Sequence, residues 1–165
     1  PPAFPANRPD KPLITGSPRM TSHTLSTDFE CMCNTKLKRA LGANAMFSAL
    51  SGVALVLAAP IAAELLFSMP LSVFGFGAVT ILRMVGIGLI LFALAVGWAG
   101  RQERPVAPIV TAISLADFGW VIGSVLLLGF AAPTFTTMGI AMIGTIGLIV
   151  LGFGVAQLGA LRHRA

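Results

Sequence analysis

The sequence predicts an all-α integral membrane protein with four transmembrane helices, on three observations. The chain has 165 residues, 56% of them hydrophobic and only 10% charged, whereas soluble domains carry about 25% charged residues. Its mean hydropathy is +0.89, and four apolar runs are long enough to cross a bilayer. Its basic residues flank these runs and form no continuous patch, which argues against nucleic acid as a partner despite the net charge of +5.

Residues 1–34 are predicted to be a disordered cytoplasmic tail, because they are rich in Pro, Ser, Thr and Asn and have no apolar period. The chain begins with Pro1 and not with methionine. Its first residues therefore either belong to a fragment or precede the natural start, for which Met20 is a candidate. Residues 35–165 are expected to form the transmembrane domain.

The four predicted spans cover about residues 40–62, 77–100, 106–130 and 136–161. Each reaches the length of about 20 residues that a helix needs to cross the hydrocarbon core. None alternates in polarity as a transmembrane β-strand does. Because backbone groups in lipid must satisfy one another, helices are the remaining choice. The apolar loop 64–76 is expected to lie along the outer interface as a short helix or half-turn.

The basic residues predict the direction of the chain. They precede the first span, lie between the second and third, and follow the fourth: Lys36, Lys38, Arg39, Arg101, Arg104, Arg162 and Arg164. The loops 64–76 and 131–135 contain no Lys or Arg. The positive-inside rule therefore places both termini in the cytoplasm of a multi-pass protein of the cell or inner membrane.

Two segments align in a way that predicts an internal duplication. "ANAMFSALSGVALVLAAP" (43–60) matches "ADFGWVIGSVLLLGFAAP" (116–133), which sets Asn44 opposite Asp117. The motif Ile-Gly-Leu-Ile also recurs in the second and fourth spans. The pattern predicts two helical hairpins as parallel repeats about an axis along the membrane normal. Chance alignment of apolar, Gly-rich helices is the alternative.

Asp117 is the only charged residue between Arg104 and Arg162. At mid-membrane a carboxylate costs about 2.5–3.5 kcal/mol, which points to proton or cation binding. If Ala-Ala-Pro at 131–133 marks the outer boundary, Asp117 lies one turn inside the inner interface, where it can extend toward water and accept a hydrogen bond from Ser114. The interface anchor is the preferred interpretation. Arg83, near the outer end of its span, is expected to reach the outer headgroups.

Pairs of small residues four positions apart predict where helices pack closely. The pairs are Gly119 and Gly123, Ala93 and Gly97, and Gly152 and Ala156. Such strips indicate a bundle or contact with a second chain.

The sequence contains few residues of the kinds that form metal or catalytic sites. Cys31 and Cys33 could hold a soft metal ion, but structural zinc usually takes four ligands and only His23 lies nearby, so free thiols are the expectation. With no nucleophile–base pair and no paired carboxylates, we expect neither an enzyme nor a bound cofactor. The leading hypothesis is an accessory or assembly subunit that packs on a membrane-protein partner or a second copy. The alternatives are a proton- or cation-coupled transporter or channel using Asp117, and a lipid- or quinone-associated protein.

Overall fold

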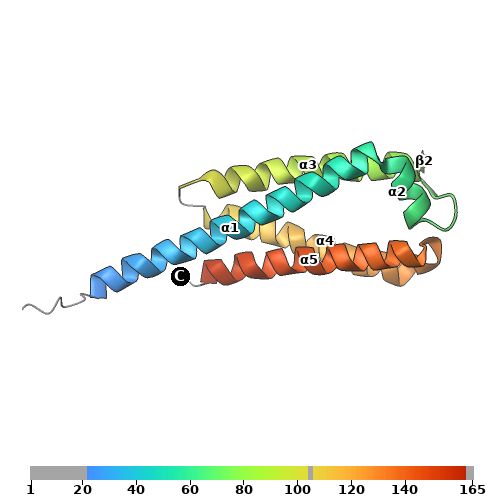
Figure 1. Cartoon of the computed structure of the whole chain (residues 1–165). Coiled ribbons are helices and arrows are strands. Elements are labelled where there is room, and N and C mark those ends of the chain that lie inside the picture. Colours follow the sequence, from blue (N-terminus) through green and yellow to red (C-terminus); the bar gives the residue numbers. More distant parts are fainter. Residues whose placement is uncertain (1–21, 104–105, 163–165) are drawn as a thin grey trace, which may run out of the picture.

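Four long helices, laid side by side, make up most of the chain (Figure 1). The computed structural model describes the backbone of residues 22–103 and 106–162, with side chains from Thr35 onward. The elements in order are α1 (Ser22–Leu57), α2 (Ala59–Leu66), β1 (Ser72–Val73), β2 (Phe76–Gly77), α3 (Ala78–Arg101), α4 (Ala107–Ala131), the 3-10 turn η1 (Ala132–Thr134) and α5 (Thr137–Arg162).

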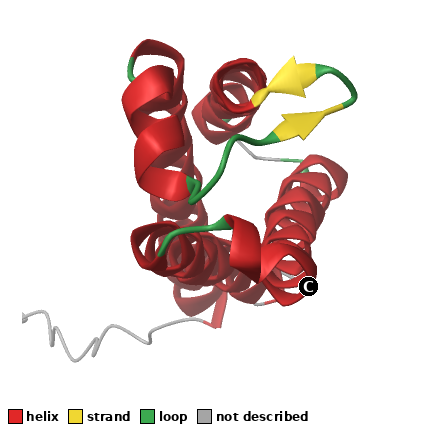
Figure 2. Cartoon of the chain, turned by 90° about the vertical axis from the view of Figure 1, so that its right-hand side faces the viewer, coloured by secondary structure: helices red, strands yellow, loops and turns green. Residues whose placement is uncertain are grey.

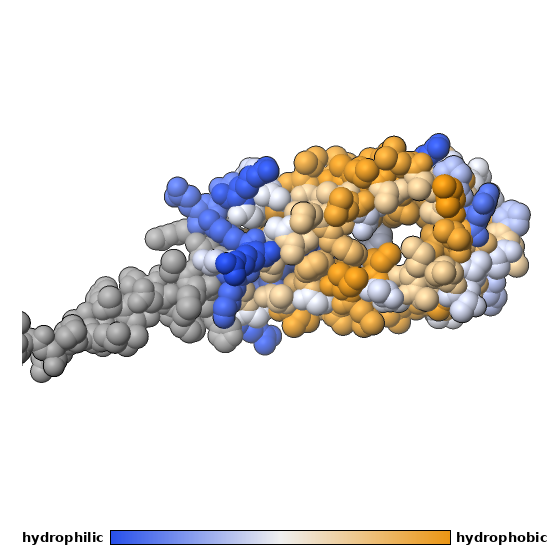
Figure 3. All heavy atoms as spheres, in the orientation of Figure 1, coloured by the Kyte–Doolittle hydropathy of each residue, from blue (hydrophilic) through white to orange (hydrophobic). Residues whose placement is uncertain are grey.

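Four stretches of helix are long and apolar enough to span a membrane, as the sequence predicted. They are Thr35–Leu57, Ala78–Arg101, Ala107–Thr134 and Thr137–Arg162. The first ends earlier than predicted because Pro60 starts a separate helix, α2, in whose first turn it lies. Large apolar side chains cover the outside of the bundle between its two polar ends (Figure 3). This surface suits contact with lipid.

Helix α1 begins well before the membrane span. The backbone of residues 22–34 is helical, whereas the sequence predicted a disordered tail up to residue 34. The physical reason is that no Gly or Pro interrupts the chain between Thr21 and Gly42, so the helix of the span can continue toward the N-terminus. Residues 1–21, the rest of the predicted tail, lie outside the described residues.

The loop after α1 carries more structure than the predicted interfacial helix. Helix α2 is followed by a two-stranded antiparallel ladder in which Ser72 pairs with Gly77 and Val73 with Phe76. Gly75 lies in the turn with φ +82°, a conformation that glycine adopts without strain. Figure 2 looks along the helices from this end and shows the strands at one corner of the bundle. This small β element departs from the all-α prediction.

The end of α2 is joined to the chain that leads into α5. The Thr136 N–H donates to the Leu66 carbonyl at 2.9 Å, and the Ser68 N–H donates to the Thr134 carbonyl at 3.0 Å. A Cβ added to Gly139 would lie 2.4 Å from the Leu66 oxygen, so only glycine fits there. We call the contact of residues 65–68 with 133–139 the α2 clasp. It ties the first half of the chain to the second.

The closest approach between long helices is that of α1 and α3. A Cβ added to Gly52 would lie 2.7 Å from the Gly86 oxygen, and one added to Gly86 would lie 2.8 Å from the Gly52 oxygen. Helix α3 runs along α1, and α4 runs along α5. The backbones of α1 and α3 meet with no side chain between them, as small residues permit.

The predicted packing strips are used only in part. Ala93 is buried, and a Cβ on Gly97 would meet the Ala45 Cβ at an ordinary 3.8 Å. By contrast, a Cβ on Gly119, Gly123 or Gly152 would meet nothing within 4 Å, and Ala156 is exposed. Within the described chain, therefore, no other helix packs against the strip of Gly119 and Gly123 or the strip of Gly152 and Ala156. Spacing alone does not say which side of a helix faces its neighbour, and here α4 and α5 are turned with these strips outward.

Candidate functional site

Five polar side chains are buried inside the bundle, and they come from three helices. Asn44 and Ser48 belong to α1, Ser114 and Asp117 to α4, and Gln157 to α5. We call these five residues the polar cluster. Asp117 is 3% exposed and lies about 15 Å along the α4 axis from Ala107, given a rise of 1.5 Å per residue. It is therefore nearer the middle of its helix than the end.

The Asp117 carboxylate is the hub of the cluster. Its Oδ2 accepts a hydrogen bond from Asn44 Nδ2 at 2.7 Å and another from Gln157 Nε2 at 3.2 Å. The two serines complete the network: the Ser48 hydroxyl donates to Asn44 Oδ1 at 3.3 Å, and the Ser114 hydroxyl donates to Gln157 Oε1 at 3.1 Å. Each serine engages an amide oxygen, so that both amide N–H groups face the carboxylate.

Helical spacing explains how each helix presents its part of the cluster. Ser48 follows Asn44 by four residues, and Ser114 precedes Asp117 by three, so each pair lies on one helix face. On α4 the buried residues Val110, Ile113, Ser114 and Asp117 form a single stripe with this period. The polar groups are thus part of the face that α4 buries.

The other carboxylate oxygen, Oδ1, accepts no hydrogen bond from any described residue, and Asp117 has no ion-pair partner among them. No fully enclosed side-chain oxygen or nitrogen in the described chain lacks a hydrogen-bond partner. Oδ1 must therefore keep some accessible surface. It is available to take a proton or to contact a small cation.

An apolar layer lies between the polar cluster and the end of the bundle where α1 and α5 carry their basic residues. It consists of six buried side chains that pack together: Leu37, Leu41, Val96, Ala99, Val110 and Ile113. Ile113 is one turn from Asp117 and Leu41 is one turn from Asn44, both toward that end. These side chains therefore lie between the carboxylate and the basic residues at this end.

These contacts differ from those expected of an interface anchor. An interface anchor would extend its carboxylate toward water, but the structure turns it into the bundle. The reason is that Asn44 and Gln157 supply hydrogen-bond donors there. Ser114, expected to bond Asp117, donates to Gln157 instead.

Sequence reasoning missed Gln157 and Ser48. A signal was present for Gln157, because it is the only residue with an amide side chain in α5.

The remaining predicted residues lie away from the cluster. Arg83 is exposed on α3, five residues after its first residue, Ala78. The side chains of Cys31 and Cys33 lie outside the described ones. Among the side chains that are described, no group of three or more His, Cys, Asp or Glu could hold a metal ion.

Comparisons with known proteins add no relative: no protein-family model matches the chain, and neither the curated proteins nor the solved structures gave a match.

Proposed function

We propose that the protein is a small membrane transporter or channel in which Asp117 binds and releases a proton or a small cation. The observation that carries this is a carboxylate buried among helices with only neutral hydrogen-bond donors around it. Ionisable groups inside transmembrane bundles are costly and mark ion or proton pathways by default. A transporter or channel was an alternative on the sequence alone, behind an accessory subunit, and here it becomes the leading proposal.

The network gives this binding step a structural consequence. Oδ2 is held by α1 and α5 through two amide N–H donors, while Oδ1 remains available on the same carboxylate. Uptake of a proton or cation at Oδ1 neutralises the charge to which both amides donate. The bonds from Asn44 and Gln157 weaken, because hydrogen bonds to an ionised acceptor are the stronger ones. Loading of Asp117 thereby changes how α4 is held between α1 and α5.

The test is a flux measurement on the purified chain in vesicles that contain a pH-sensitive dye. With an imposed potassium diffusion potential, we expect Asp117-dependent proton entry that Asp117→Asn abolishes. Asp117→Asn should remain monodisperse, because asparagine keeps the size of the side chain. The matched control is Glu64→Gln, which removes the exposed acid of α2. Equal flux through well-folded Asp117→Asn and the unchanged protein would contradict the proposal, as would absence of any flux with protons or with sodium.

The proposed orientation places the end with the basic residues in the cytoplasm, with both termini inside. It rests on the basic residues that flank the spans and on the lack of any Lys or Arg in residues 64–76 and 131–135. Reporter fusions after Arg104 and at the C-terminus should read as cytoplasmic, and fusions near Pro70 and Pro133 as external. A cytoplasmic signal at Pro70 would contradict the proposed orientation.

The duplicated hairpin also remains part of the proposal. Asn44 and Asp117 occupy matched positions in the aligned segments 43–60 and 116–133, and their side chains bond to each other. Residues near an axis that relates two copies are expected to meet their own counterparts, which supports a parallel repeat.

A second candidate function is that of an accessory subunit that packs on another membrane helix. It is favoured by the outward-facing strip of Gly119 and Gly123. A Cβ added at either glycine would have no neighbouring described residue within 4 Å. Gly123→Leu should leave the monomer's thermal stability unchanged while lowering the fraction of dimer measured in nanodiscs. Gly88→Leu, at another open glycine on α3, is the control. No change in association for Gly123→Leu would count against a second copy at this strip.

A further inference from the structure

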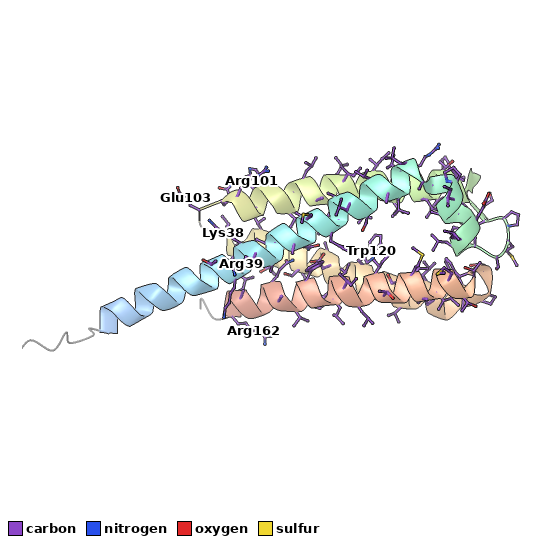
Figure 4. The ribbon with its side chains drawn as sticks, viewed as in Figure 1. Lys38, Arg39, Arg101, Glu103, Trp120 and Arg162 are labelled. Carbon is purple, nitrogen blue, oxygen red and sulfur yellow. The ribbon has the colours of Figure 1, made fainter. Side chains whose placement is uncertain are left out.

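Basic side chains from α1, α3 and α5 gather at one end of the bundle, where Figure 3 shows hydrophilic residues and Figure 4 labels Lys38, Arg39, Arg101 and Arg162. We call them the basic collar: Lys36, Lys38, Arg39, Arg101 and Arg162. Among the described side chains Glu103 is the only acid at this end, and Asp28 and Glu30 lie further toward the N-terminus of α1, where side chains are outside the described ones. The opposite end has one cation, Arg83, and one acid, Glu64. The collar is therefore strongly positive and the opposite end is close to neutral. Arg104 and Arg164 lie outside the described residues.

The collar lies where the apolar core of the bundle ends. Leu37 is buried in the apolar layer, while its neighbours Lys36 and Arg39 are exposed on the same stretch of α1. The cations therefore project outward at the level where the apolar core ends. Trp98, 57% exposed, lies one turn before Arg101 on α3, and exposed tryptophan is typical of the membrane interface.

We propose that the basic collar binds the phosphate-bearing headgroups of anionic phospholipids in the leaflet at this end. Arginine forms charge-assisted, often bidentate hydrogen bonds with phosphate oxygens, and Lys adds point charges. A zwitterionic headgroup carries its own cation and gains less from a cluster of positive side chains. The cations come from α1, α3 and α5, so the site is formed by three helices and does not belong to a single one. This inference is independent of the role of Asp117.

The position of Trp98 makes the binding measurable. The chain has two tryptophans, so Trp120→Phe leaves Trp98 as the single emitter, one turn from Arg101. The protein is reconstituted into vesicles of phosphatidylcholine and phosphatidylglycerol, and either one or the other lipid carries brominated acyl chains that quench tryptophan. We expect brominated phosphatidylglycerol to quench Trp98 more strongly at equal mole fraction, since one cation near an anionic surface favours binding by roughly fivefold.

Matched variants locate the effect. Arg101→Gln should reduce the preference for phosphatidylglycerol at Trp98 several-fold, and Arg101→Lys should retain most of it. Arg83→Gln, which removes an exposed cation at the opposite end of the same helix, should leave the preference unchanged. Because Arg101 is exposed, all three variants should stay monodisperse. If Arg101→Gln proves unstable, loss of the preference at high salt in the unaltered collar provides the same test.

Three outcomes would overturn the proposal. The first is equal quenching by the two brominated lipids. The second is an equal loss of preference in Arg83→Gln and Arg101→Gln. The third is loss of the preference on addition of inorganic phosphate but not of sodium chloride at the same ionic strength, which would identify a small-anion site instead of a lipid site.

Discussion

Replacing Gly52 with leucine is expected to force α1 away from α3 and to prevent recovery of folded protein. Even a Cβ at this position would lie 2.7 Å from the Gly86 oxygen and 2.9 Å from Ile90 Cγ1. The first of these atoms is backbone in the middle of a helix and cannot move without moving the helix. Overpacking costs about 1–3 kcal/mol where side chains can adjust, and we expect a loss in the upper part of that range or beyond.

The measurement is the monodisperse fraction in detergent and the temperature of thermal unfolding. Gly88→Leu is the control, because it adds the same side chain to a transmembrane helix at a glycine with nothing within 4 Å of an added Cβ. Equal stability of the two variants would mean that α1 and α3 do not approach as closely as the structure shows.

Replacing Asn44 with leucine is expected to destabilise the bundle by about 1–3 kcal/mol, the usual cost of a buried polar group left without its partner. The change removes the shorter of the two hydrogen bonds to Asp117, the one of 2.7 Å, and places an apolar side chain against the carboxylate. Adding Asp117→Leu to Asn44→Leu should recover part of the loss, because it removes the carboxylate that had lost its donor. The recovery stays incomplete, because the Gln157 amide then lacks its acceptor.

The comparison is made by denaturant titration of the two single variants and the double variant. Ser124→Ala is the control, because its hydroxyl bonds only the Trp120 carbonyl of its own helix. If the effects of Asn44→Leu and Asp117→Leu simply add, the two side chains are not coupled, and the polar cluster does not join α1 to α4.

The four spans could be predicted because they depend on local properties, namely the length of each apolar run and the charges that flank it. The packing glycines could not be assigned in the same way. Gly119 and Gly123 have the favoured spacing, yet Gly52 and Gly86 make the close approach. What decides between them is the rotation of each helix about its axis, and this is a property of the whole bundle.

The polar cluster shows the same limit. The intramembrane carboxylate was evident from the sequence, but its direction depends on donors that lie 73 and 40 residues away in the chain. Counting residues from Ala-Ala-Pro at 131–133 favours a place for Asp117 near the water interface, because the count includes none of those partners. An isolated carboxylate is drawn toward water, whereas one that meets two amides can remain inside.

The α2 clasp has a consequence for how the chain is assembled during synthesis. Its two sides, residues 65–68 and 133–139, are separated by the strands and by both α3 and α4. Helix α2 packs on α3, which is synthesised earlier, but its hydrogen bonds to residues 133–139 cannot form until the ribosome has produced the start of α5. Until then the Leu66 carbonyl lacks the donor that Thr136 later supplies. Packing of the last helix therefore completes the attachment of the first loop. A nascent chain that ends before Thr134 would contain three spans but would lack the hydrogen bonds of the α2 clasp.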